Sequence, residues 1–315
     1  MLTLERIREL PANIDEFIEE IGEGMGRLYG PAAAREYFDT ARTRLLVMLR
    51  HPRVETFACL DADDAAGLLW FMVHDDIGHI AFIHVLQRYS GKGIEEELIN
   101  EAVIFLRERG VRAILSEGLC FGATDARAAY RGQGFRRVER LVMSAPLDAA
   151  GLACAGPAST SPCDPGRRRS AADIIVAAYR DHPDRLLHPD VHDTAAALRF
   201  LDTATQGGYG RACPAYLRLY MNDGQAVGAV IGCEAASGVG FVLQVAVRPA
   251  FQGRGIGACL LRELAAEFRA AGLIRVALGV SVSNPARRLY ERLGFVSIHG
   301  VDAHIWWRNG DGPPA

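Results

Sequence analysis

The chain has 315 residues and a formal net charge of −3 at pH 7, which argues against nucleic acid or an anionic membrane as a partner, because both require concentrated positive charge. Half of its residues are hydrophobic and 23% are charged, the balance of a folded protein long enough for two domains of ordinary size. Its seven cysteines show no CxxC spacing, so we interpret them as reduced, buried thiols.

The first ten residues, MLTLERIREL, carry charges where a secretory signal needs an apolar core. No apolar run in the sequence approaches the roughly 20 residues that a helix needs to span a bilayer. We therefore expect a cytoplasmic protein with no membrane partner.

The first clear pattern of elements starts as an apolar strand at Gly78 and continues through the turn YSGKGIE (residues 89–95) into a helix that ends at Gly110. A short helical stretch, ARAAYRGQGF, follows at residues 126–135. Segment 157–166 is rich in Pro, Ser and Gly, which is typical of a loop, and we expect it to link this pattern to the next one.

Segment 179–193, YRDHPDRLLHPDVHD, contains three histidines and four aspartates. These residue types suit a metal ion, but no pair at the helical i, i+4 spacing comes with an obvious third ligand. We therefore expect no metal and interpret the segment as a solvated acidic loop, whose charge would suit a positively charged amine.

The same order of elements then returns. Two strands surround the turn DGQ at residues 223–225, and the buried strand GFVLQVAV leads through the turn FQGRGIG into a helix that ends at Gly272. A further strand, IRVALGVSV (residues 274–282), and the short helix PARRLYERLGF (residues 285–295) complete the pattern.

The two patterns are copies of one another. Segment 78–110 aligns with segment 240–272 without a gap at an offset of 162, and the two short helices align at an offset of 160. We therefore predict two tandem α/β domains, residues 1–148 and 149–315, each with a mixed central β-sheet flanked by α-helices.

The glycine turn FQGRGIG, residues 251–257, connects a strand to a helix. Glycines let main-chain N–H groups approach an anion, and the helix N-terminus adds partial positive charge, although a tight turn without a ligand is the alternative. The stretch has no lysine, which excludes a Walker loop. A dinucleotide fingerprint fits Gly253, Gly255 and Ala258, but the following strand ends GVSVSN without the carboxylate that would hold a ribose.

Coenzyme A is the third interpretation of this turn. Gln252, Gly255 and Gly257 fit the pattern Q/R-x-x-G-x-G/A, the sequence VAVRP precedes them, and SNPARRLYERLGF follows. Together, in this order, these three elements resemble the GCN5-related N-acetyltransferase (GNAT) family.

The resemblance implies an acetyl-CoA site in the second domain. Main-chain groups of residues 252–257 would hold the pyrophosphate, the backbone of residues 245–247 would pair with the pantetheine arm, and Tyr290 would protonate the departing thiolate as general acid. Packing on the apolar face of its helix is the alternative role of Tyr290. The expected cofactor-binding residues are Val245, Ala246, Val247, Gln252, Gly253, Arg254, Gly255, Ile256, Gly257, Asn284 and Tyr290.

The sequence leaves the general base open. Many members of the family carry Glu on the strand before the turn, where this chain has Gln244, which accepts no proton. Glu234 on the preceding strand, a chain of water molecules, and an acceptor amine of low pKa are the alternatives.

The first copy departs from the pattern at its own turn. Glu95 occupies the position of Gly257, and two more glutamates follow it. A like charge about 4 Å away costs roughly 4 kcal/mol at an effective dielectric near 20, so we expect this copy to bind acetyl-CoA poorly. Of the other matched positions, Thr124 replaces Asn284 and Tyr130 matches Tyr290.

We therefore predict that the second domain moves an acetyl group from acetyl-CoA to a primary amine, of a small molecule or a peptide N-terminus, by direct attack. The first domain would be its degenerate partner. A non-catalytic sensor or scaffold that binds acyl-CoA is the alternative. Tyr290 and Asn284 favour the enzyme, whereas Gln244 is equally compatible with the sensor.

Overall fold

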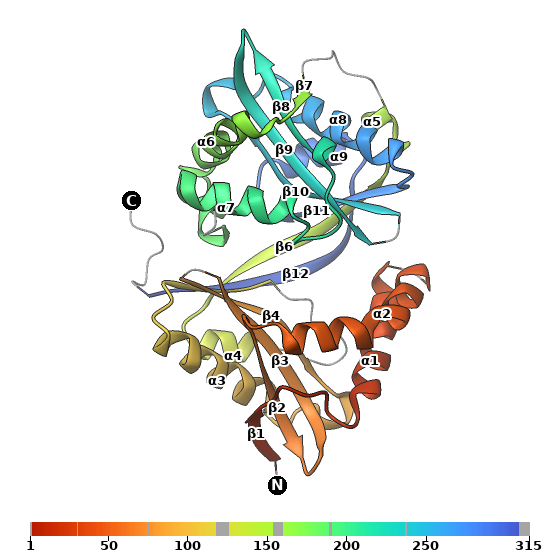
Figure 1. The fold of residues 1–315 in the computed structure, drawn as a ribbon, viewed down its shortest axis with the longest axis vertical. Helices are drawn as coiled ribbons and strands as arrows, with labels where there is room; N and C mark the ends of the chain where they lie inside the picture. Colours follow the sequence, from red (N-terminus) through yellow and green to blue (C-terminus); the bar gives the residue numbers. More distant parts are fainter. Residues whose placement is uncertain are drawn as a thin grey trace. The chain divides into compact units, whose positions relative to one another are not determined.

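The computed structural model describes residues 2–29, 31–74, 76–117, 126–153, 160–188, 191–236 and 238–308. The chain divides into two compact units: unit 1 has residues 1–139 and 301–315, and unit 2 has residues 140–300. It enters unit 2 within strand β6 (Arg136–Pro146) and returns to unit 1 within strand β12 (Val296–Trp307), as the colours of Figure 1 show.

Unit 1 is a mixed sheet with its helices. Its elements are β1 (Leu2–Arg6), α1 (Ile14–Tyr29), α2 (Pro31–Arg50), β2 (Val54–Asp61), β3 (Asp64–His74), β4 (Ile77–Val85), the 3-10 helix η1 (Gln87–Tyr89), α3 (Ile94–Glu108), β5 (Ala113–Ser116) and α4 (Arg127–Gly132). Strands β1 to β4 pair antiparallel in sequence order, and β4 pairs parallel with β5. The segment His304–Trp307 of β12 pairs antiparallel with β5.

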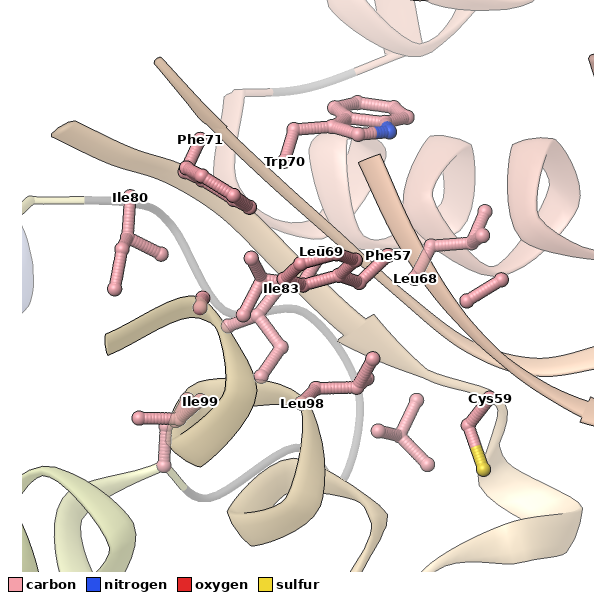
Figure 2. Close-up of a cluster of buried hydrophobic side chains, with 14 of the residues drawn as sticks. Phe57, Cys59, Leu68, Leu69, Trp70, Phe71, Ile80, Ile83, Leu98 and Ile99 are labelled. Atoms are coloured by element: carbon pink, nitrogen blue, oxygen red, sulfur yellow. The ribbon is translucent and has the colours of Figure 1, made fainter. Parts of the chain in front are cut away.

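The core of unit 1 lies where α3 meets strands β2 to β4. Leu98 and Ile99 of α3 point toward Leu69 and Ile83 of the strands, whereas Trp70 points to the other face of the sheet (Figure 2). The alternation follows from the period of two along a strand, and burial of each such aliphatic side chain contributes about 1.5–3 kcal/mol.

Unit 2 repeats this order of elements. They are α5 (Ala150–Ala153), β7 (Thr160–Pro162), the 3-10 helix η2 (Pro165–Arg167), α6 (Arg168–Tyr179), the 3-10 helix η3 (Pro183–Leu187), α7 (Thr194–Thr205), the 3-10 helix η5 (Pro214–Tyr216), β8 (Leu217–Asn222), β9 (Gln225–Ala236), β10 (Val239–Val247), the 3-10 helix η6 (Pro249–Phe251), α8 (Ile256–Ala270), β11 (Arg275–Ser281) and α9 (Arg287–Arg292). Strands β7 to β10 pair antiparallel, and β10 pairs parallel with β11.

Helix α8 packs on the sheet of unit 2 through its predicted apolar face. Leu260, Leu264 and Phe268 are fully buried. The ring of Phe268 lies so close to Gly232 and Gly240 that a β-carbon at either glycine would collide with it. The two glycines therefore allow the helix to approach strands β9 and β10 closely.

The final strand of each sequence copy pairs within the other copy's unit. Residues 140–146 of β6 pair antiparallel with β11 in unit 2, while residues 304–307 of β12 pair with β5 in unit 1. The compact units therefore differ from the predicted domains 1–148 and 149–315, because a strand at a sheet edge takes the partner that completes its hydrogen bonds rather than its neighbour in sequence.

The predicted fold class is confirmed: each unit is an α/β structure with a mixed sheet flanked by helices. Among the residues that the structure describes, no helix has the length and apolar character needed to cross a membrane.

Candidate active site

Strands β10 and β11 separate halfway along their length. They pair only where residues 239–242 meet residues 275–278, yet β10 continues to Val247 and β11 to Ser281. A register shift against β9 falls at the same place, between Val242 and Gln244. Beyond it, β10 keeps its partner on the β9 side and leaves its other edge without a strand, so main-chain groups there are available to a ligand.

This opening forms part of a cavity of about 560 Å³ in unit 2. The remaining walls come from the glycine turn, from Asn284 and α9, and from the segment between α6 and α7. All the residues predicted to bind the cofactor line the cavity except Arg254. Distant parts of the sequence thus meet around one space of the size typical of ligand sites.

The glycine turn has the backbone conformation of an anion site. Gly253 and Gly255 have φ values of 75° and 80°, which side-chain-bearing residues rarely adopt, and Gly255 caps the N-terminus of α8. The first helical bond back to the turn runs from the Cys259 N–H to the Gly255 carbonyl. The preceding N–H groups at the start of α8 have no acceptor within the helix and remain free for a ligand.

The polar side chains of the turn bond to its own main chain. The Gln252 amide donates to the Val247 carbonyl at 3.1 Å, and the Arg254 guanidinium donates to the Ala250 carbonyl at 3.1 Å while lying over the ring of Phe251. The Arg254 side chain therefore braces the turn, which leaves the predicted role of its main-chain N–H unchanged.

Tyr290 lies on α9 and lines the cavity with only 7% of its surface exposed. Burial, with a smaller contribution from the nearby charge of Asp184, raises the pKa of Tyr290 to about 12. Its ring packs beside Phe295. The side chain thus combines the apolar packing and the cavity position that the sequence offered as alternatives, and it keeps its proton at neutral pH.

Gln244 and Glu234 on the central strands are both held by hydrogen bonds. The Gln244 side-chain oxygen accepts a hydrogen bond of 3.0 Å from the Tyr179 hydroxyl. Glu234 is held by Arg211 through two bonds of 2.8 Å and by the Tyr216 hydroxyl, and these hydrogen bonds lower its pKa. Glu234 is not among the residues that line the cavity, and its role as a base stays a prediction.

The segment predicted to be a solvated acidic loop contributes directly to the cavity. Asp184, on η3, is only 5% exposed, and its carboxylate accepts a hydrogen bond of 2.8 Å from the Asn284 amide. His182 accepts the main-chain N–H of Asp184 through Nδ1. The sequence did not single out Asp184, because its partner Asn284 is 100 residues away and only the tertiary fold joins them.

His188 and Arg140 also line the cavity. Burial, followed by the positive charge of Arg140 and the neighbouring His182, lowers the pKa of His188 to about 3, so its imidazole stays neutral. Arg140 belongs to β6 and thus to the sequence of the first copy, so the motifs of the second copy do not include it. Within the described residues, no three His, Cys, Asp or Glu side chains are arranged to hold a metal ion.

The turn of the first copy has the same backbone but different surroundings. Gly91 and Gly93 have φ values of 76° and 78°, and α3 begins at the residue after them. The first turn of α3 carries Glu95, Glu96 and Glu97. Tyr130 is buried, donates to the Ser116 hydroxyl at 2.8 Å and stacks on His304. Thr124 lies outside the described residues.

A family model described as the acetyltransferase (GNAT) family matches residues 16–135 and again residues 177–295, which together exceed half of the chain. The chain belongs to the GNAT family. The two matches coincide with the two sequence copies and confirm a tandem GNAT protein. A search among curated proteins found no sequence that matches it.

Solved structures share this fold at low sequence identity. A GCN5-related N-acetyltransferase from Sphaerobacter thermophilus is 19% identical, with a TM-score of 0.66 over 97% of this chain and 95% of that one. A tandem GNAT protein from the clavulanic acid biosynthesis pathway is 16% identical, with a TM-score of 0.55 over the whole of both chains. A glucosamine N-acetyltransferase region of a fungal multi-domain beta-N-acetylglucosaminidase is 15% identical, with a TM-score of 0.61 over 97% of this chain and 38% of that one.

Proposed function

We propose that unit 2 of this GNAT protein transfers an acetyl group from acetyl-CoA to a primary amine, of a small molecule or a peptide N-terminus. The observation that carries the proposal is that the opening of β10, the glycine turn and Tyr290 all line one cavity. When bound, acetyl-CoA supplies the acetyl group as a thioester. From the sequence alone we also propose a cytoplasmic location.

The residues around the cavity fit the parts of acetyl-CoA. Free N–H groups at the start of α8, behind Gly253 and Gly255, suit the pyrophosphate. We assign the pantetheine arm to the main chain of residues 245–247, on the edge of β10 that has no strand partner. A main-chain N–H of this edge would stabilise the negative charge that develops on the reacting carbonyl oxygen.

We assign Tyr290 the role of general acid toward the departing sulfur. With its pKa at about 12 and an ordinary thiol pKa near 8.5, the proton moves uphill by about 3.5 units, or roughly 4.8 kcal/mol. Burial of the sulfur in the same cavity raises the thiol pKa as well and narrows that difference. Enclosure of the sulfur therefore lowers the cost of the transfer.

The variant Tyr290→Phe tests this assignment. We expect acetyl-CoA to bind with an affinity within about twofold of the original, while kcat for CoA release with an amine panel falls at least about 10-fold, because only the acidic proton is lost. Tyr130→Phe is the matched control, since it removes the equivalent hydroxyl in unit 1 and leaves kcat unchanged. Equal effects of the two substitutions would contradict the assignment.

Gln244 favours the second candidate function, a sensor or scaffold that binds acyl-CoA without turnover, because it stands where many family members carry a base. The same assay separates the two functions. Tight binding of acetyl-CoA by the unmodified protein, together with no CoA release for any amine, would select the sensor.

A further inference from the structure

Asp184 is a buried carboxylate that faces the cavity. Its side chain is 6% exposed and belongs to the cavity wall. The Asn284 amide donates to Oδ2 at 2.8 Å. Among the described residues, the other oxygen, Oδ1, accepts no hydrogen bond, which leaves it available to a ligand in the cavity.

Asp184 also lacks a cationic partner in the part of the chain that the structure describes. The nearest basic nitrogen is Nδ1 of His182, 3.9 Å from Oδ2. That nitrogen accepts the main-chain N–H of Asp184, so its lone pair is occupied and the proton of the neutral ring lies on Nε2. A buried carboxylate without a compensating cation is costly, and a bound cation would remove that cost.

Asn284 fixes the direction of this carboxylate. Its Nδ2 donates to Asp184, and its Oδ1 accepts the main-chain N–H of Ala286 at 2.9 Å. Both ends of the amide are thus engaged by the protein. Asn284, predicted from the sequence to meet the cofactor, in this structure positions Asp184 at the cavity wall.

Aromatic rings on the cavity wall also suit an organic cation. Tyr179 and Tyr290 present aromatic rings, which attract cations placed over their faces. The other ionisable side chains that line the cavity are Arg140 on β6, His182 and His188 near η3, and Arg292 on α9. Among the described residues, no ion pair of 4.0 Å or less joins either arginine to Asp184.

We propose that Asp184 binds the ammonium group of the acceptor, that Asn284 positions Asp184 for this contact, and that the acceptors are primary amines that are cationic in solution. This inference rests on the proposed function, since it names the substrate class of the same cavity. It predicts discrimination between a cationic ligand and a neutral ligand of the same shape.

Equilibrium binding tests the contact without any turnover. Benzylammonium and benzyl alcohol have nearly the same shape and differ in charge, and saturation-transfer NMR with the full chain measures both. We expect the unmodified protein to bind benzylammonium about 10- to 100-fold more tightly than Asp184→Asn does, the range for loss of a charge-assisted bond. Benzyl alcohol should bind both proteins alike.

The control variant is Asp181→Asn, which removes the same charge from an exposed position three residues away. It should leave the affinity for benzylammonium unchanged. Equal affinity of Asp184→Asn and the unmodified protein for benzylammonium would overturn the proposal. Unchanged affinity for acetyl-CoA in Asp184→Asn shows that the variant is folded, and the isosteric side chain can still accept from Asn284.

Steady-state kinetics separates this proposal from the proposed function. Asp184→Asn should raise KM for a cationic amine with little change in KM for acetyl-CoA, and Asn284→Ala should raise the amine KM to a smaller extent. If no amine is acetylated while benzylammonium still requires Asp184, the proposed function fails and the cation site stands. If amines are acetylated with the same KM by Asp184→Asn, the cation site fails and the proposed function stands.

Discussion

At the scale of single residues, the protonation states of the side chains on the cavity wall determine which of them donate hydrogen bonds and which accept them. Burial raises the pKa of Tyr179 above its ordinary value, so its hydroxyl remains a donor to Gln244. The Nδ1 atom of His182 is occupied by the Asp184 N–H. In the proposed site an acceptor amine would meet the hydroxyl of Tyr179, two arginines and the carboxylate of Asp184.

His188 should make the stability of the protein depend on pH. Its pKa is lowered to about 3 in the folded state from an ordinary value of 6.5. Between these values the unfolded chain binds a proton that the folded chain does not, so the free energy of unfolding falls as pH decreases. From pH 7 to pH 5 this one group lowers it by up to about 2 kcal/mol.

Urea unfolding of the variant His188→Asn at pH 7 and pH 5 checks this effect. The variant should lose less stability than the unmodified protein over the same interval. His51→Asn, at an exposed histidine, serves as control and should behave like the unmodified protein. The prediction is wrong if His188→Asn loses as much stability as the unmodified protein.

At the scale of elements, one strand, turn and helix motif occurs twice with the same backbone and different chemistry. The turns at Gly91 and Gly253 have φ values of 76° and 75°. The first turn of α3 contains three glutamates, whereas the first turn of α8 contains Gly257 and no acidic residue. Carboxylates stabilise a helix start but repel a phosphate there, so the same backbone geometry suits the proposed pyrophosphate in unit 2 and not in unit 1.

Gly257→Glu should weaken binding of acetyl-CoA by unit 2, because it places a glutamate where the first copy has Glu95. A carboxylate at this position would lie in the turn assigned to the pyrophosphate, and a β-carbon built there would lie 3.2 Å from the Leu289 side chain. We expect the Kd for acetyl-CoA, measured by calorimetry, to rise at least about 100-fold, or about 2.8 kcal/mol. Ala266→Glu adds the same charge at an exposed position farther along α8 and should bind normally. Comparable Kd values for both variants would contradict the proposed pyrophosphate site.

The sequence predicted those features that local pattern encodes. The two copies, the helix after Gly255 and the glycine turn all follow from spacing and conformational preference, and the structure confirms their secondary structure. The hydrogen bond between Asp184 and Asn284 did not follow, because it joins residues of separate elements. The bond from the Arg254 side chain to the Ala250 carbonyl did not follow either, because it depends on the path of the turn.

At the scale of the whole molecule, each half of the chain is incomplete alone, because β6 pairs with β11 of unit 2 and β12 pairs with β5 of unit 1. Unit 2 contains residues 140–146 of the first copy, and unit 1 contains residues 301–307 of the second. Strand pairing across such distances in sequence leaves no local signal, because any apolar strand of similar length fits an edge. The predicted boundary at residue 148 therefore marks the sequence repeat and not the limit of a unit.

Fragments 1–148 and 149–315 should each fold poorly when expressed separately. Mixing them should restore folding. Alone, the first fragment lacks β12, one of the two partners of β5, and the second lacks β6, one of the two partners of β11. Each loss exposes a row of unpaired main-chain groups. Fragment 149–315 should bind acetyl-CoA at least about 10-fold more weakly than the equimolar mixture, as measured by calorimetry. Binding by fragment 149–315 alone with the affinity of the intact chain would show that the exchanged strand is dispensable.

The exchanged strand β6 also makes the sheet of unit 2 depend on the first copy. Residues 140–146 complete the sheet that carries the cavity, and Arg140 lines the cavity itself. Deleting the first copy would therefore remove a strand from the sheet of unit 2. Deleting the second copy would likewise remove the β12 segment that pairs with β5, so neither half can be lost without opening the sheet of the other.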